Sequence, residues 1–496
     1  MEKIFRSYYT KSDFITNYMV SKIEPNDCDT ILEPCGGDGA FIDALLNINP
    51  NLNIETCDLN RSAVKVLRKK YKGIFNISVR EADTLLDTTF DKYSINGYYQ
   101  KIIGNPPYGG WQDLDKRAIL KKKYNGFYVK ETYTLFLLRC ISLLADDGVL
   151  SFIIPDTFLF LHNHKEIRKH ILSTTSIKEI LIFPSKLFPG VSFGYSNLCI
   201  ITLQKTRSNK TALNNTVRII RNLQNEIDLK HVLNEQIEKF DVIFLKQDEI
   251  LNSPDSAFLI SQGSINETIV SCETRLGELC DCVTGIYCGD NKRFLFVDET
   301  CEKPPLGYSA INDSNVSYDC ENLIGLDAPK SFIQIIKGSS KTSYYRTAPL
   351  WYIDWSFSAI RHYNTDKKAR FQNSTYYFKQ GIAMPMVKSS QIKATLMDKC
   401  VFDQSIVGVF PKENRYMFFV LAYLNSKIAN TFMHIINPTA NNSSNYVKKL
   451  PIFVPTQDEL SYINSLVFNI FETHNFELYQ PQIDVFFANK FNDTNL

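Results

Sequence analysis

Residues 30–41 read TILEPCGGDGAF, a short apolar strand that runs through a glycine-rich loop into the amphipathic stretch Phe41 to Leu46. Glycines in such a loop permit positive φ angles and let the backbone approach a ligand closely. Nucleotide-binding α/β folds place their ligands beside loops of this kind, at the carboxyl ends of strands. The stretch therefore predicts an α/β fold with a binding site at the end of its first strand.

A second strand, residues 53–57, ends in Asp58, about 20 residues beyond the loop. An acidic side chain at this spacing can accept hydrogen bonds from the hydroxyl groups of a ribose. The same pattern fits a dinucleotide dehydrogenase. It therefore indicates a cofactor of the adenosine type without naming it.

Further strand-like segments alternate with a helical segment. Residues 78–83 read as a strand that ends in Asp83, and residues 101–104 and 148–155 read as two more strands. Between the last two, apolar residues recur with helical spacing from Tyr133 to Leu144. Strands that alternate with helices predict a mostly parallel, doubly wound sheet whose ligands gather at one edge.

The strand at 101–104 is followed directly by Asn105-Pro106-Pro107-Tyr108. Proline fixes φ and restricts the residue before it, so two prolines hold this turn stiffly. The side-chain oxygen of Asn105 and the carbonyl of Pro106 could each accept one hydrogen of a flat exocyclic amine, while Tyr108 stacks on its ring. Such a turn suits methylation of adenine N6, but it also fits a simple turn that closes a strand.

Taken in order, these motifs resemble the gamma class of S-adenosylmethionine-dependent DNA adenine-N6 methyltransferases, and most closely the Taq-type enzymes of restriction-modification systems. The loop matches the family pattern E-P-x-x-G-x-G-x-F, and Gly148-Val149-Leu150 follows in the expected place. The match is dense from about Tyr8 to Lys205. Tyr9-Thr10-Lys11-Ser12 resembles the N-terminal methionine-binding motif, although the family usually has proline at the position of Lys11.

The resemblance implies a Rossmann-like methyltransferase domain and a role for each matching residue. Thr10, Glu33, Pro34, Gly37, Gly39 and Asn105 would surround the cofactor, with Glu33 near its methionine portion. Asp58 would bind its ribose and Asp83 would accept from its adenine amine.

For the target, the resemblance implies that Asn105 and Pro106 hold the amine and that Tyr108 stacks on a flipped adenine. A base taken out of a duplex needs support on its opposite face as well. The stretch from Lys186 to Gly190 matches the loop that supplies this second ring in the family, which makes Phe188 the candidate, with Phe193 and Tyr195 as alternatives.

Length and composition limit the remaining possibilities. A chain of 496 residues that is 44% hydrophobic suits two domains with sizeable cores. We expect the catalytic domain at 1–245 and a mixed α+β target-recognition domain with a C-terminal helical segment at 246–496. The stretches from Arg275 to Leu279 and from Lys448 to Ile452 resemble the start and end of such recognition domains.

Neither a signal-like N-terminus nor a long apolar run is apparent, which predicts a cytoplasmic protein that does not enter a membrane.

The twelve cysteines contain no Cys-x-x-Cys pair, so reduced thiols are expected and no metal. Cys35 lies in the cofactor loop, not at the catalytic turn, and covalent catalysis is therefore not expected. The motifs also begin by residue 10 and leave no room for an N-terminal nuclease, so any cognate restriction endonuclease would be a separate chain.

The formal charge of +2 decides little about nucleic acid, because 55 basic residues nearly balance 53 acidic ones. Clusters of basic and polar residues in the second half suit contacts with phosphates and base edges of duplex DNA, and equally any solvated loop. The candidate DNA-binding residues are Lys337, Lys341, Arg346, Arg361, Lys367, Lys368 and Arg370.

The motifs and the resemblance together imply an enzyme that methylates adenine N6 in double-stranded DNA, and we expect it to be a monomer. Two alternatives remain open. Some ribosomal RNA methyltransferases and the release-factor glutamine methyltransferases share the same four-residue turn. A DNA-specificity subunit could also keep this fold without turnover.

Overall fold

The computed structural model describes residues 10–109, 114–188, 197–260, 264–301, 304–347, 350–439 and 441–491. The chain divides into two compact units, Met1–Ile260 and Ser261–Leu496. Each unit is built around its own sheets, and each is described by itself.

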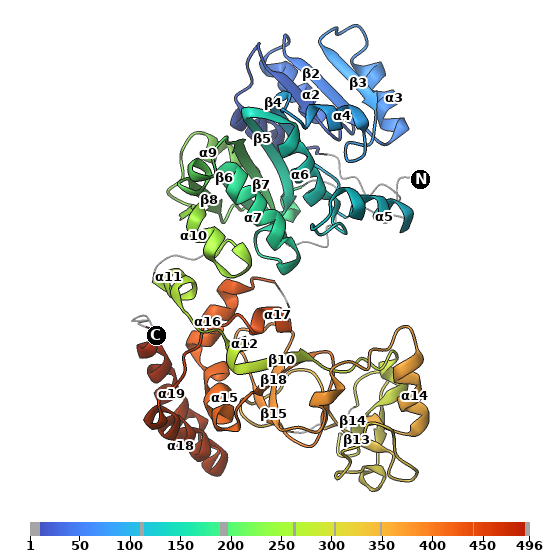
Figure 1. The fold of residues 1–496 in the computed structure, drawn as a ribbon, viewed down its shortest axis with the longest axis vertical. Coiled ribbons are helices and arrows are strands. Elements are labelled where there is room, and N and C mark those ends of the chain that lie inside the picture. Colours follow the sequence, from blue (N-terminus) through green and yellow to red (C-terminus); the bar gives the residue numbers. More distant parts are fainter. Residues whose placement is uncertain are drawn as a thin grey trace. The chain divides into compact units, whose positions relative to one another are not determined.

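The first unit is an α/β structure built on one large sheet (Figure 1). Its strands follow the order β3-β2-β1-β4-β5-β7-β6-β8-β9. The strands from β3 to β5 pair in parallel, whereas β7 is antiparallel to both β5 and β6. Their bounds are β1 Thr30–Glu33, β2 Asn53–Asp58, β3 Ile77–Glu81, β4 Tyr99–Gly104, β5 Leu144–Pro155, β6 Thr175–Pro184, β7 Asn197–Lys205, β8 Thr216–Arg221 and β9 Asp241–Lys246.

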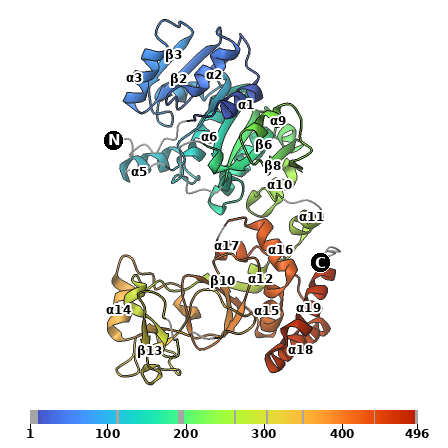
Figure 2. The same cartoon turned by 180° about the vertical axis from the view of Figure 1, so that it is seen from behind.

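Helices cover both faces of this sheet, as expected for a doubly wound fold. On one face α1 packs against α2 and α9, as seen from behind in Figure 2, and on the other α6 packs against α4 and α7. Their bounds are α1 Asp13–Ile23, α2 Ala40–Ile48, α3 Arg61–Lys70, α4 Thr88–Tyr93, α5 Leu114–Lys123, α6 Thr132–Leu143, α7 Lys165–Thr174, α8 Asn209–Leu213, α9 Ile227–Leu233 and α10 Gln247–Asn252. Short 3-10 turns are η2 Asp156–Leu159, η3 His162–His164, η4 Ser185–Leu187 and η5 Pro254–Ser256.

Side chains that cap the backbone fix where several of these helices begin. The Ser12 hydroxyl accepts from the Ile15 amide at the start of α1, and the Asn60 side chain accepts from the Ser62 amide at the start of α3. Such caps satisfy amide groups that have no partner within the first turn of a helix. The cap at Asn60 thus starts α3 just beyond the carboxyl end of β2.

The boundary between the units lies later than the expected one near residue 245. Strand β9 pairs with β8 at the edge of the large sheet, and Gln247 directly after it is fully buried. The Gln247 side chain accepts from the Ile177 amide and the Asn215 side chain, and it donates to the carbonyls of Leu172 and Thr175. Residues just beyond 245 are therefore part of the first unit.

The second unit combines two smaller sheets with helices, which agrees with the expected mixed α+β class. The sheets have the strand orders β10-β18-β15-β16 and β12-β11-β14-β13-β17. The strands are β10 Cys280–Thr284, β11 Leu295–Asp298, β12 Ser309–Ile311, β13 Phe332–Ile336, β14 Trp351–Asp354, β15 Gly381–Pro385, β16 Thr395–Met397, β17 Val401–Phe402 and β18 Ile406–Pro411. The helices are α11 Ser264–Ser271, α12 Leu276–Leu279, α13 Asn291–Phe294, α14 Phe357–Thr365, α15 Met417–Asn425, α16 Lys427–Ile436, α17 Ser444–Val447, α18 Gln457–Thr473 and α19 Phe476–Lys490, with 3-10 turns η6 Asp313–Asn315, η7 Ser374–Tyr376 and η8 Asn414–Tyr416.

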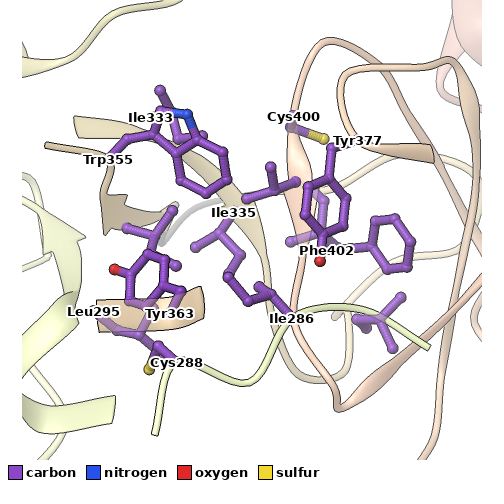
Figure 3. Close-up of a cluster of buried hydrophobic side chains, with 14 of the residues drawn as sticks. Ile286, Cys288, Leu295, Ile333, Ile335, Trp355, Tyr363, Tyr377, Cys400 and Phe402 are labelled. Atoms are coloured by element: carbon purple, nitrogen blue, oxygen red, sulfur yellow. The ribbon is translucent and has the colours of Figure 1, made fainter. Parts of the chain in front are cut away.

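A cluster of aromatic and aliphatic side chains forms the core of this unit (Figure 3). Trp355 is fully buried in it, and its indole N–H donates to the carbonyl of Asn322 at 2.9 Å. Cys288 and Cys400 lie in the same cluster as free thiols. In the part of the chain that the structure describes, no group of cysteine, histidine and carboxylate side chains could hold a metal ion. Cys288 and Cys400 pack in this cluster as small apolar residues.

The apolar stretch from Phe418 to Asn430 belongs to two helices. Helix α15 ends at Asn425 and α16 begins at Lys427, with Ser426 between them in an extended conformation. The Ser426 side chain accepts from the Ala429 amide and so caps α16. A serine inside an apolar helical pattern can thus start a new helix as well as continue the old one.

Over the described ranges, no helix is both long enough and apolar enough to cross a membrane.

We predict that Gln247→Leu lowers the free energy of unfolding by about 3 kcal/mol, because several buried polar groups of β6 and α7 lose their partner. Urea unfolding followed by circular dichroism measures this change. The same substitution at the exposed Gln224 is the control and should change the stability little. Equal effects of the two variants would contradict the placement of residue 247 in the core of the first unit.

Candidate active site

The parallel strands of the first unit bring the predicted site residues to one edge of the sheet. Strand β1 ends at Glu33, β2 at Asp58 and β4 at Gly104, immediately before the turn at Asn105. Parallel neighbours end on the same side, and Glu33 pairs with Thr56 near the end of β2. The two strand-end carboxylates and the turn therefore share this edge.

The glycine-rich loop after β1 is held in place by the end of β2. The Gly37 amide donates to Asp58 Oδ2 at 2.9 Å. Gly39 has a φ of 86°, and a Cβ at this residue would lie 2.3 Å from the Tyr71 hydroxyl. Both the left-handed conformation and the lack of space exclude a side chain at this position. Gly39 thus lets α2 begin close to the loop.

The carbonyl of Pro34 ties this loop to the segment after β3. It accepts a hydrogen bond from the Thr84 hydroxyl at 2.5 Å, and the Cys57 thiol lies 3.5 Å from it. Pro34, predicted to lie in the cofactor loop, therefore acts through its backbone. The contact draws Asp83, the neighbour of Thr84, towards the same edge.

A buried arginine on α6 holds the segment after β3 in place. Arg139 on α6 donates to the carbonyls of Thr84 and Asp87 at 3.2 and 2.9 Å, and it forms an ion pair with Asp91 at 2.6 Å. No motif in the sequence points to Arg139, Thr84 or Tyr71. The sequence holds no signal for them, because each acts on residues that are distant along the chain.

Glu33 carries a buried carboxyl group at the centre of the site. Its side chain is 2% exposed, and Oε2 has no hydrogen-bond partner among the described residues. Burial raises the pKa of Glu33 well above its ordinary value, and the nearby Asp58 and Asp38 raise it further. A bound cation would relieve both effects. The site is therefore suited to a positively charged ligand.

Asp58 is oriented by backbone amides. Oδ1 accepts from the Asn60 amide at 2.7 Å, while Oδ2 accepts from Gly37. Burial raises the pKa of Asp58, and these hydrogen bonds partly oppose the shift. A carboxylate can accept about four hydrogen bonds, so this one retains capacity for the hydroxyl groups of a ribose.

Asp83 lies two residues beyond the end of β3, with both carboxylate oxygens engaged. Oδ1 accepts from the Leu85 amide at 3.0 Å. Oδ2 forms an ion pair of 2.7 Å with Lys116 on α5. This lysine belongs to none of the motifs in the sequence.

The turn after β4 lies against both the N-terminal segment and the glycine-rich loop. The Asn105 amide nitrogen donates to Thr10 Oγ1 at 3.3 Å, and the Cys35 thiol donates to the Asn105 carbonyl at 3.3 Å. Burial raises the pKa of Cys35 well above its ordinary value, so its sulfur stays protonated. The structure thus brings Thr10, Cys35 and Asn105 together.

Both candidate rings for stacking on a base are buried. Tyr108 and Phe188 are each 1% exposed. The Tyr108 ring meets Tyr133 edge to face at 6.4 Å, and the Tyr133 hydroxyl lies 3.2 Å from Nε2 of the buried His164. The alternatives Phe193 and Tyr195 lie outside the described residues, as does Tyr9. One edge of Tyr108 is therefore supported by Tyr133, which is itself held against the buried His164.

The basic residues predicted to bind DNA fall into two groups in the second unit. Lys337 forms an ion pair of 3.5 Å with the buried Asp403, and Arg346 donates to the carbonyls of Lys337 and Gly338. Burial lowers the pKa of Arg346 to about 10. These two side chains hold their own unit together. The other five are exposed, namely Lys341, Arg361, Lys367, Lys368 and Arg370.

Known proteins share this sequence pattern. Residues 43–188 match the Eco57I restriction-modification methylase family, a range that includes Asp58, Asp83 and the turn at Asn105. The type II methyltransferase M.HindII of Haemophilus influenzae is 24% identical over 462 residues, which cover 86% of this chain and 84% of that protein. The type II methyltransferase M.AccI of Acinetobacter calcoaceticus is 26% identical over 284 residues, which cover 54% of this chain and 48% of that protein. The match thus spans most of the first relative and about half of the second.

A solved structure has a similar fold. The chain matches a nuclease-deletion mutant of the Type ISP restriction-modification enzyme LlaGI, solved with a DNA substrate mimic, at a TM-score of 0.56 and 13% identity. The match covers 95% of this chain and 47% of that one. At this identity the likeness concerns the fold alone. The family match and the type II relatives together support a restriction-modification methyltransferase.

We predict that Glu33→Gln stabilises the cofactor-free protein increasingly as the pH rises. Because the pKa of Glu33 is raised in the folded state, its contribution to stability is present at low pH and is lost as the pH rises through that pKa. Glutamine has no carboxyl group to ionise, so the variant does not lose stability in this way. Melting temperatures of both proteins, measured from about pH 5 to about pH 8, should therefore diverge in favour of the variant.

The control is Glu238→Gln, at an exposed carboxylate, whose melting temperature should follow that of the wild type at every pH. A constant difference between Glu33→Gln and the wild type across the pH range would refute the raised pKa.

Proposed function

We propose that this protein is a site-specific DNA methyltransferase that transfers a methyl group from S-adenosylmethionine to N6 of an adenine flipped out of double-stranded DNA. It would be the modification enzyme of a restriction-modification system. The observation that carries the proposal is the position of Asn105. This residue follows β4 at the edge that also holds Glu33 and Asp58, and the Cys35 thiol joins its backbone to the glycine-rich loop.

In the proposed cofactor site, each carboxylate has a separate task. The buried Glu33 would face the positively charged methionine portion, which is the partner that its unbonded oxygen and raised pKa call for. Asp58 would accept from the ribose hydroxyls, and Asp83 from the adenine amine. Thr10 would help to position the methionine portion beside Asn105. S-adenosylmethionine would supply an activated methyl group, so that no metal is needed.

In the proposed target site, Asn105 and Pro106 would accept the two hydrogens of the adenine amine. The lone pair of that nitrogen is delocalised into the ring, and two fixed acceptors would draw it towards tetrahedral geometry. Preorganised dipoles aimed at developing charge usually contribute more to catalysis than any other single effect. The rigid turn would hold these acceptors in place without reorganisation.

Tyr108 and Phe188 would stack on opposite faces of the flipped base. Each ring is 1% exposed, so the base can reach them only after a local movement uncovers both. Extrusion of the base costs a few kcal/mol of stacking, which the two aromatic contacts would help to offset. The packing of Tyr133 and His164 against Tyr108 would keep its ring in a fixed position.

The second unit would grip the duplex and select its sequence. Arg361 lies on α14, and Lys367, Lys368 and Arg370 follow in the segment directly after it. These side chains and Lys341 are exposed, as phosphate contacts require. Lys337 and Arg346 would instead support the fold of this unit through their internal bonds.

The decisive test uses tritiated S-adenosylmethionine with duplex DNA, ribosomal RNA and release factor in parallel reactions. Label in DNA alone supports the proposal, whereas label only in RNA or in protein would overturn it. Cofactor binding without methylation of any duplex would favour a specificity subunit. Expression in a methylation-free host, followed by modification-sensitive sequencing, would report the base and the recognised sequence.

We predict that Asn105→Ala reduces the methylation rate by at least about 100-fold, as the loss of one preorganised catalytic dipole does in other enzymes. Cofactor affinity, measured by isothermal titration calorimetry, should remain close to that of the wild type. The control is Asn49→Ala, at the opposite end of α2 from the glycine-rich loop. Wild-type methylation by Asn105→Ala would remove Asn105 from the mechanism.

We predict that the triple variant Lys367→Ala, Lys368→Ala and Arg370→Ala weakens binding to all duplex sequences alike. The slope of log Kd against log salt concentration should fall by about 3, which is about one for each lost phosphate contact. The control removes three exposed lysines of the first unit, Lys65, Lys69 and Lys72. Fluorescence anisotropy at several salt concentrations measures both slopes, and an identical change in the two variants would argue against a specific contact.

A further inference from the structure

The ion pair between Lys116 and Asp83 lies where the proposed function needs an unoccupied acceptor. Lys116 Nζ is 2.7 Å from Asp83 Oδ2, and the two side chains are 29% and 20% exposed. The other oxygen, Oδ1, already accepts from the Leu85 amide. The lysine therefore occupies the oxygen of Asp83 that is not engaged by the backbone.

We propose that Lys116 is a built-in competitor of the cofactor for Asp83. Asp83 Oδ2 can accept more than one hydrogen bond, so the competition is for the space beside this oxygen. The lysine ammonium moves away as the adenine amine of the cofactor binds, and it returns when the cofactor departs. The inference rests on the proposed function, because it takes Asp83 as the acceptor of the cofactor amine. It adds a residue that sets the affinity for the cofactor and that no motif contains.

The surroundings favour exchange at this position. A lysine ammonium on a flexible stem gives up a partly exposed ion pair at little cost, because solvent screens such pairs. Asp83 itself stays in place when the lysine leaves, because Thr84 remains bonded to the Pro34 carbonyl and to Arg139. The carboxylate is thus fixed by the backbone, while its cationic partner is exchangeable.

A second ion pair on the same helix provides a matched control. Lys123, also on α5, lies 2.7 Å from Asp91 Oδ1. Asp91 additionally pairs with Arg139 at 2.6 Å, so it retains a cationic partner when Lys123 is removed. No cofactor group is proposed to bind at Asp91. Lys116→Met and Lys123→Met therefore remove the same charge from the same helix, and only the first frees the proposed acceptor.

The experiment measures the Kd of the full-length protein for S-adenosylmethionine and for S-adenosylhomocysteine by isothermal titration calorimetry. We expect Lys116→Met to bind both about two- to five-fold more tightly than the wild type at low salt. The advantage should shrink at about 1 M salt, because screening already weakens the competing pair in the wild type. Lys123→Met should bind as the wild type does.

A further pair of variants separates this inference from the proposed function. Asp83→Asn should weaken cofactor binding, and Lys116→Met should have no further effect when added to it, since the contested carboxylate is gone. Unchanged binding by Asp83→Asn would overturn the proposed role of Asp83 itself. If Asp83→Asn weakens binding while Lys116→Met alone leaves it unchanged or weakens it, the role of Asp83 stands and the competition is wrong.

Discussion

The candidate site depends on the parallel pairing of β1 with β2 and β4. In this register Ile31 lies beside Ile54 on one side and beside Lys101 on the other. The strands therefore end together, and the residues that follow them are brought to one edge although they are separated along the chain. An antiparallel partner would place its strand end at the opposite edge and divide the site.

Bonds between the strand-end loops give this edge its shape. Gly37 donates to Asp58, Thr84 donates to Pro34, and Cys35 donates to the carbonyl of Asn105. Each bond joins a loop to the one that follows another strand of the sheet. A substitution in one loop is thus transmitted to the next, which explains why residues with no proposed contact to a ligand, such as Thr84 and Tyr71, belong to the construction of the site.

Carboxyl groups gather at this edge of the sheet. Burial and neighbouring carboxylates raise the pKa of Glu33, and burial raises that of Asp58. The ionised forms of these carboxyl groups are therefore costly in the folded protein, and a positive charge nearby would lower that cost. At Asp83, Lys116 supplies such a positive charge. Its position links α5, which follows the turn at Asn105, to the segment after β3.

The α/β class, the first five strands along the chain and the residues at their ends could be predicted from the sequence alone, whereas the order of the strands within the sheet could not. Strand and helix periodicities are local, and the glycine-rich loop and the turn at Asn105 each lie within one short segment. Only the tertiary structure decided which side chains reach these segments from elsewhere in the chain, as Arg139 and Lys116 do. It also decided that Gln247 is buried in the first unit and that Arg346 donates to the carbonyls of Lys337 and Gly338, because burial and long-range contacts depend on packing that no short stretch of sequence records.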